Sequence, residues 1–139
     1  MQNYGNQSYG NITLKQATAY SSNTGYIQVA EAIGNDKIMS LVKKLGIDPA
    51  KDNIEDVPVM TLGTGSISPL EMASAYATFA NGGYYRQPIA ITEIDSRTGS
   101  VLYQHTDNPT QVLTEGEAAA VTDVLSGVMQ AAARVPPAR

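Results

Sequence analysis

Residues 68–80 carry the strongest local folding signal in the chain, a helix start followed by an almost wholly apolar helix. Ser68 and Glu71 form the Ser-x-x-Glu pattern in which each side chain caps a backbone N–H group, and Pro69 suits the first helical position. A helix that is apolar around most of its circumference needs neighbours on several sides. We therefore predict a globular fold in which neighbouring elements cover this helix on several sides. The apolar residues to be covered are Leu70, Met72, Ala73, Ala75, Tyr76, Ala77, Phe79 and Ala80.

The other patterns predict further helices and one hairpin. Helices are expected at residues 14–20, 24–33, 36–45 and 115–131, with Thr13 and Asn35 as the N-caps of the first and third. Thr114 and Glu117 form another capping box at the start of the last helix, and Pro136 and Pro137 prevent that helix from continuing into the tail at residues 134–139. Residues 47–65 are expected to form a long connection with one short helical turn. Two strands, residues 89–94 and 100–105, flank a polar loop. The predicted fold class is α+β, mainly helical, with helices around a Ser-x-Asn turn plus one β-hairpin.

Composition limits the kinds of function open to the chain. The net charge of −4 and the scattering of nine Lys and Arg argue against a nucleic-acid partner. With no cysteine and one histidine, no metal site or cofactor is expected, and His105 is predicted to be an ordinary polar residue at a strand end. No apolar stretch approaches the ~20 residues needed to cross a bilayer, so no membrane segment, signal peptide or anchor is expected in this chain.

The sequence YSSNTG at residues 20–25 separates two predicted helices. A Ser-x-Asn turn offers a hydroxyl that can relay a proton and an amide that can bind a substrate carbonyl, and here these groups belong to Ser21 and Asn23. The same residue types are common helix caps. From the tripeptide alone, capping is the more frequent role.

Five stretches resemble the transpeptidase domain of class A penicillin-binding proteins, and they follow the order of that family. They are NYGNQSYGNITLKQATAYSSNTG, VAEAIGNDKIMSLVKKLGID, TLGTGSISPLEMASAYATFANGGYYRQP, GSVLYQH and VLTEGEAAAVTDVLSGVM. Together they span nearly the whole chain, and residues 63–88 are the most specific part. The resemblance implies a partial penicillin-binding-protein transpeptidase fold.

The same resemblance implies roles for the Ser-x-Asn turn in peptidoglycan crosslinking through an acyl-serine intermediate. The Ser21 hydroxyl would relay a proton to the departing amine, and the Asn23 amide would hold the acyl-side amide of a stem peptide or β-lactam. Ser22 is the variable middle position and receives no role. The parent enzyme would act at the extracytoplasmic face of the bacterial cell membrane.

Two motifs of the family have no clear counterpart here. The family's Ser-x-x-Lys nucleophile motif precedes Ser-x-Asn, and its Lys-Thr-Gly motif follows the last helix. Ser40-Leu41-Val42-Lys43 matches the first only as a string within a predicted helix, and residues 97–99, Arg-Thr-Gly, lie in a predicted hairpin loop. Residues 1–139 are therefore expected to form a single partial transpeptidase domain, inactive alone.

Three hypotheses remain open at this stage. The first is the partial transpeptidase domain, whose apolar helix would leave an exposed patch that promotes self-association. The second is a non-catalytic module that binds a cell-wall peptide or a protein through Ser21 and Asn23 as hydrogen-bonding groups only. The third, the least favoured, is an independent acyl enzyme that uses Ser40 and Lys43. A lysine that is not buried stays charged and cannot act as a base.

Overall fold

The computed structural model describes residues 1–132, which are mostly helical, as predicted. Two short 3-10 helices occur, η1 near the N-terminus and η2 in the long connection predicted for residues 47–65. The tail at residues 134–139 lies outside the described residues. The helices in chain order are η1 (Tyr4–Asn6), α1 (Leu14–Ala19), α2 (Asn23–Ile33), α3 (Asn35–Lys44), η2 (Pro58–Leu62), α4 (Pro69–Ala80) and α5 (Glu115–Ala132).

Three of the helices begin with a capping box, in which side chain and backbone bond reciprocally. In α4 the Ser68 hydroxyl accepts from the Glu71 N–H while the Glu71 carboxylate accepts from the Ser68 N–H, as the sequence predicts. Thr114 and Glu117 form the same pair at the start of α5. A third box opens α1, where Thr13 was predicted only as a simple N-cap. These starts are local, because each box needs only four consecutive residues.

The boundaries around α2 and α3 differ from the predictions by one position each. Gly34, with φ of 91°, ends α2 and also takes the N-cap position of α3, so Asn35 is the first helical residue rather than the cap. At its other end α2 begins at Asn23, one residue earlier than predicted, and Ser22 is its N-cap. A positive φ is easily reached by glycine, which allows two helices to meet at one residue.

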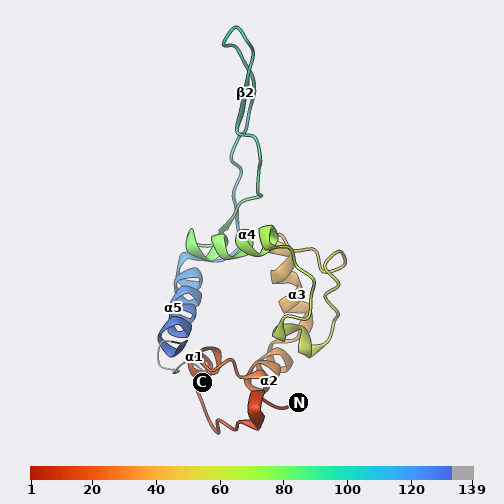
Figure 1. Cartoon of the computed structure of the whole chain (residues 1–139), viewed down its shortest axis with the longest axis vertical. Coiled ribbons are helices and arrows are strands. Elements are labelled where there is room, and N and C mark those ends of the chain that lie inside the picture. The colour runs from red at the N-terminus through yellow and green to blue at the C-terminus, as the bar shows by residue number, and fades with distance from the viewer. Residues whose placement is uncertain (133–139) are drawn as a thin grey trace, which may run out of the picture.

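The strands form two small antiparallel pairs within the described residues. The predicted hairpin is present but shorter than expected, with β2 (Glu93–Asp95) paired to β3 (Val101–Gln104). It projects away from the helices on the α4 side of the molecule, at the opposite end from α1 and α2 (Figure 1). A second pair, β1 (Tyr84–Tyr85) with β4 (Thr110–Gln111), joins the base of the hairpin to the chain before α5 and was not predicted.

The core lies between the end of α3, the loop that follows it and α4. Leu45, Ile47 and Ala75 form its buried cluster, and Phe79 of α4 packs against them. The prediction that α4 is buried on several sides is wrong for the described residues, whereas its exposed side chains agree with the apolar patch expected of a partial domain. Apolar side chains remain exposed along this helix, namely Leu70 at 64%, Met72 at 38% and Tyr76 at 52%. The self-association expected from such a patch stays a prediction.

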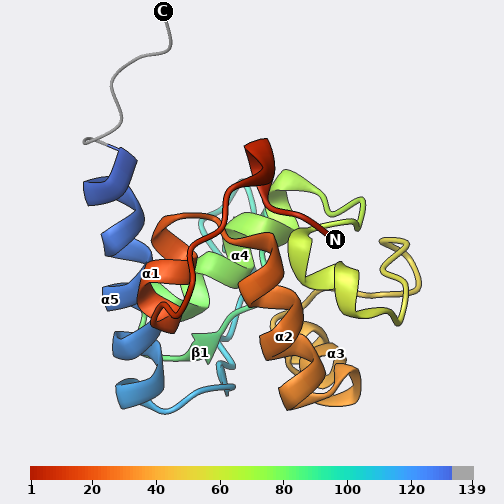
Figure 2. The ribbon, with the colours of Figure 1, turned by 90° about the horizontal axis from the view of Figure 1, so that it is seen from below.

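The remaining helices pack against their neighbours in pairs. α5 packs against both α1 and α4, and α2 packs against α1, α3 and η2. The N-terminal segment crosses the ends of α1 and α2 before entering α1 (Figure 2). Among residues 1–132, no helix is both long and apolar enough to span a membrane.

Candidate functional site

The link between α1 and α2 places Ser21 at an exposed, conformationally strained position. Tyr20 is the C-cap of α1, and the Ser22 N–H bonds back to the Ala17 carbonyl at 2.9 Å, so the chain must reverse within two residues. Ser21 takes the left-handed conformation, with φ of 53°, to do so. This conformation is unfavourable for residues with a Cβ atom and is found where the surroundings enforce it. The Ser21 side chain is left facing solvent.

Ser22 has a structural role that the sequence did not reveal. Its side chain is only 2% exposed, and its hydroxyl accepts a hydrogen bond of 3.2 Å from the Gly25 N–H, which makes it the N-cap of α2. The capping role expected for a residue in this tripeptide thus belongs to the middle serine. Ser21 and Asn23, on either side of it, are not needed as caps.

The N-terminal segment binds the same turn through Asn3. The Asn3 carboxamide oxygen accepts from the Thr24 N–H at 3.1 Å, and the hydroxyls of Ser22 and Thr24 each lie 3.3 Å from it. The Asn3 amide nitrogen donates to the Gln7 carbonyl at 3.0 Å. Asn3 is 8% exposed and is therefore a buried polar group with its hydrogen bonds satisfied.

Asn23 lies beside this contact and is half-buried. Its side-chain amide nitrogen donates to the Gln2 carbonyl at 3.3 Å. Because a backbone carbonyl only accepts, this bond orients the amide group with its nitrogen toward the N-terminal segment. The second N–H of the amide and its oxygen stay available to a ligand.

A hollow of about 670 Å³ with a mixed polar and apolar lining opens next to the turn, between the N-terminal segment and the helices α1 and α2. Asn3, Ser22, Thr24 and Gln28 contribute polar groups to its wall. Ser21 and Asn23 are not part of this wall, so the hollow and the exposed Ser-x-Asn groups are neighbouring features rather than a single cavity.

The two look-alike motifs lie where the sequence predicted. Ser40 and Lys43 are both exposed on α3 and make no hydrogen bond to each other. Residues 97–99 form the turn of the hairpin, with Gly99 at φ of 84°. His105 directly follows β3, where its N–H bonds to the Thr92 carbonyl at 2.7 Å. No cluster of metal-ligating side chains occurs within residues 1–132.

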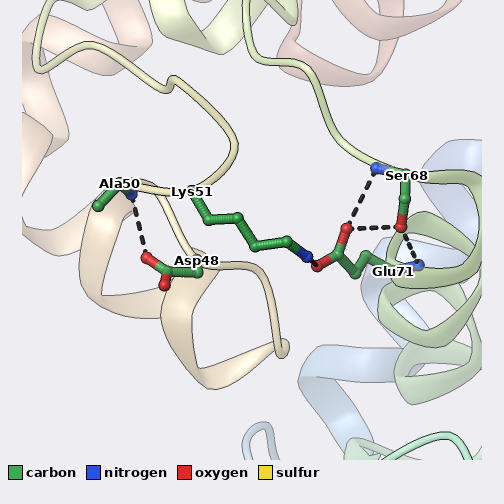
Figure 3. Close-up of polar contacts among 5 residues, drawn as sticks. All are labelled: Asp48, Ala50, Lys51, Ser68 and Glu71. Carbon is green, nitrogen blue, oxygen red and sulfur yellow. Dashed lines mark hydrogen bonds and ion pairs between the residues drawn. The ribbon is translucent and has the colours of Figure 1, made fainter.

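A second polar cluster joins the loop after α3 to the start of α4 (Figure 3). The Lys51 ammonium contacts the Glu71 carboxylate at 2.6 Å, while the other carboxylate oxygen receives the hydrogen bonds from Ser68. The bonds from Lys51 and Ser68 lower the pKa of Glu71 to about 2. The cluster lies at the end of the core helix rather than at the Ser-x-Asn turn, so we assign it to the fold.

A family model described as the penicillin binding protein transpeptidase domain matches residues 1–137. The chain belongs to this family. Penicillin-binding protein 1A of Aquifex aeolicus is 32% identical to it over 127 residues, covering 91% of this chain and 17% of the relative. Penicillin-binding protein 1A of Pseudomonas aeruginosa is 38% identical over 111 residues, covering 80% of this chain and 13% of the relative.

Solved structures confirm the partial penicillin-binding-protein fold. The penicillin G acyl-enzyme complex of penicillin-binding protein A from M. tuberculosis superposes with a TM-score of 0.80 at 21% identity, covering 99% of this chain and 36% of that one. The D,D-transpeptidase domain of a peptidoglycan glycosyltransferase from Eggerthella lenta gives a TM-score of 0.74 at 25% identity, covering 99% and 42%. This chain therefore corresponds to part of a transpeptidase domain.

Sequence reasoning missed Asn3 and Ser22. Asn3 lies in a near-repeated pentad, QNYGN then QSYGN, which predicts only an irregular lead-in. The two copies differ at one position, where the first has Asn3 and the second has Ser8, and this difference does not by itself indicate burial. The structure buries Asn3 and leaves Ser8 exposed.

Proposed function

We propose that this chain supplies the Ser-x-Asn wall of a serine D,D-transpeptidase site that crosslinks peptidoglycan stem peptides through an acyl-serine intermediate. The observation that carries the proposal is the conformation of the turn. Ser21 is exposed in a strained left-handed conformation, and neither of the two bonds that cap α2 uses its side chain. Strain of this kind persists where the surrounding structure enforces it, which is common at functional sites.

The two residues take different roles in this proposal. The Ser21 hydroxyl passes a proton to the departing amine of a stem peptide or β-lactam as the acyl-serine forms. The free N–H of the Asn23 amide donates to the carbonyl of the amide on the acyl side, with its orientation set by the bond to Gln2. We place the parent enzyme at the extracytoplasmic face of the bacterial cell membrane.

The chain by itself is proposed to remain unacylated. Its single Ser-x-x-Lys string, Ser40 to Lys43, is exposed on α3, where no neighbouring group activates the serine. Intact-protein mass after incubation with a reactive penicillin tests this directly. We expect no adduct on the isolated chain, and an adduct mapped to Ser40 would overturn this part of the proposal.

A chimera tests the roles of Ser21 and Asn23. Residues 1–132 replace the matching segment of the Pseudomonas aeruginosa relative, and acylation by a fluorescent penicillin is followed over time. Ser21→Ala and Asn23→Ala are each expected to slow acylation by about 10²-fold, the lower end of what a proton-transfer or oriented hydrogen-bonding group contributes. The matched control Ser40→Ala should acylate at the unsubstituted rate. Acylation of Ser21→Ala at that same rate would contradict the proposal.

A second function, binding of a cell-wall peptide without catalysis, is favoured by the free amide groups of Asn23 together with the neighbouring hollow, along which the rest of a peptide could lie. It needs only the hydrogen-bonding groups already described. Titration of the isolated chain with an acylated peptide ending in D-Ala-D-Ala separates the two functions. Saturable binding that is lost in Asn23→Ala would support the binding module. If neither the unsubstituted chain nor Asn23→Ala binds the peptide, only the role as part of a transpeptidase site remains.

A further inference from the structure

The start of α2 is capped by two side chains that come from different parts of the chain. The first N–H groups of a helix have no partner within it and must be satisfied from outside. Ser22, the N-cap, bonds to the Gly25 N–H at 3.2 Å, and Asn3 bonds to the Thr24 N–H at 3.1 Å. The N-terminal segment thus completes the cap of the helix that carries Asn23.

The orientation of the Asn3 amide is determined by its neighbours on both sides. The Thr24 N–H can only donate and the Gln7 carbonyl can only accept, so exchanging the oxygen and nitrogen of this amide would break both bonds. Since Asn3 is 8% exposed, water offers little replacement for either bond. Asn3 therefore has one arrangement in which the segment docks on the turn.

This docking also places the group that orients Asn23. Gln2 directly precedes Asn3, and its carbonyl accepts from the Asn23 amide nitrogen at 3.3 Å. If the segment moved away, Asn23 would lose this partner and the Thr24 N–H at the start of α2 would lose its acceptor, which leaves only the cap from Ser22 to Gly25. Ser21, between the helices, is strained in a way that only a rigid turn maintains.

We propose that Asn3 is a positioning residue for the Ser21–Asn23 pair, acting by capping α2 from a distance and by fixing the Gln2 carbonyl against Asn23. This inference rests on the proposed function, which gives Ser21 and Asn23 their roles in catalysis. It adds a residue outside the Ser-x-Asn motif on which the geometry of that motif depends.

Amide exchange and side-chain amide spectra of the ¹⁵N-labelled full chain test the proposal without a substrate. In Asn3→Ala the Thr24 amide is expected to exchange about tenfold faster, the effect of losing one net hydrogen bond. The side-chain amide signals of Asn23 are expected to move toward those of a solvated asparagine. Amides inside α4 are the internal reference, since global unfolding would accelerate exchange in α2 and α4 together.

Three further variants separate positioning from a general loss of stability. Asn3→Asp keeps an oxygen facing the Thr24 N–H but has no N–H for the Gln7 carbonyl, so it should recover only part of the Thr24 protection that Asn3→Ala loses. Asn3→Gln has the same groups displaced by one methylene and should move the Asn23 signals even if Asn3→Ala fails to fold. Asn11→Ala is the matched control, because that exposed side chain makes no hydrogen bond within residues 1–132.

The outcomes are distinct for the two proposals. Unchanged Thr24 exchange and Asn23 signals in Asn3→Ala, or Asn23 signals that stay in place in Asn3→Gln, would overturn the positioning role. Failure of the chimera to respond to Ser21→Ala would overturn the proposed function but leave these exchange measurements as they are.

Discussion

The first turns of α2 and α4 are capped in two different ways. α4 uses Ser68 and Glu71, which lie three residues apart and form a cap together with the helix itself. α2 uses Ser22 for one N–H group and Asn3, from the N-terminal segment, for another. A local cap forms from adjacent residues, whereas a remote cap forms only after the segment has docked. The helix that carries the candidate site therefore depends on tertiary structure at a point where the core helix does not.

Removing the remote cap altogether gives the largest expected effect. Deletion of residues 1–7 eliminates the bonds from Asn3 and Gln2 to the turn and should lower the free energy of unfolding by about 2–4 kcal/mol, from net contributions of roughly 1 kcal/mol per hydrogen bond. Urea denaturation measures the loss. A change below about 1 kcal/mol would show that α2 is as independent as α4 and would remove the contrast between the two helices.

Matched serine substitutions compare the two caps directly. Ser68→Ala should cost about 1 kcal/mol, as for an ordinary N-cap. Ser22→Ala should cost about 2 kcal/mol, because Ser22 is 2% exposed and its loss also removes a donor to the buried Asn3 oxygen. Equal losses in urea denaturation would indicate that the bond from the Ser22 hydroxyl to Asn3 adds nothing to stability.

The pH dependence of stability tests the contribution of Glu71 to the local cap of α4. The pKa of Glu71 is lowered from 4.5 to about 2, so its stabilising contribution is complete above pH 4.5 and is lost as pH falls through about 2. The thermal unfolding midpoint should fall over this interval, and the fall should be smaller in Glu71→Gln. Glu117→Gln is the matched control. Hydrogen bonds from Thr114 also lower the pKa of Glu117, but no lysine contacts the Glu117 carboxylate as Lys51 contacts that of Glu71. Identical pH profiles for Glu71→Gln and the unsubstituted chain would contradict the assignment.

The smallest expected effect concerns Ser21 itself. Glycine reaches a φ of 53° without the steric penalty of a Cβ atom, so Ser21→Gly should stabilise the chain by about 0.5 kcal/mol after the added freedom of the unfolded state is counted. Ser8→Gly, in the exposed lead-in, is the control and should not stabilise. A destabilised Ser21→Gly would mean that the Ser21 side chain contributes to the fold, which would weaken the case for a role in catalysis.

Features encoded by neighbouring residues were predicted well. The caps at Thr13, Ser68 and Thr114 and the hairpin turn at Gly99 depend on four or five consecutive residues, and all of them are confirmed. The candidate pair Ser21 and Asn23 was identified by resemblance, and the structure places both beside the start of α2, with Ser21 exposed and Asn23 half-buried. Their catalytic roles stay a proposal.

Features that depend on distant residues were not predicted. Nothing in an irregular lead-in indicates that Asn3 is buried against Thr24, 21 positions along the chain. The sequence predicts that α4 is buried on several sides, yet the side chains of Leu70 and Tyr76 are exposed. Helical periodicity reports which faces are apolar, and it does not report which neighbour covers each face.

The sequence by itself determined the α-helices to within about one residue at the start of α2 and α3, the hairpin and the family, because these follow from local hydrogen bonding, backbone preference and recognisable motifs. Only the tertiary structure decided that Ser22 is the cap, that Asn3 completes it and that Gln2 orients Asn23. The physical reason is that a buried amide is satisfied by whichever donor and acceptor the fold brings near it, and these partners can be far away in the sequence.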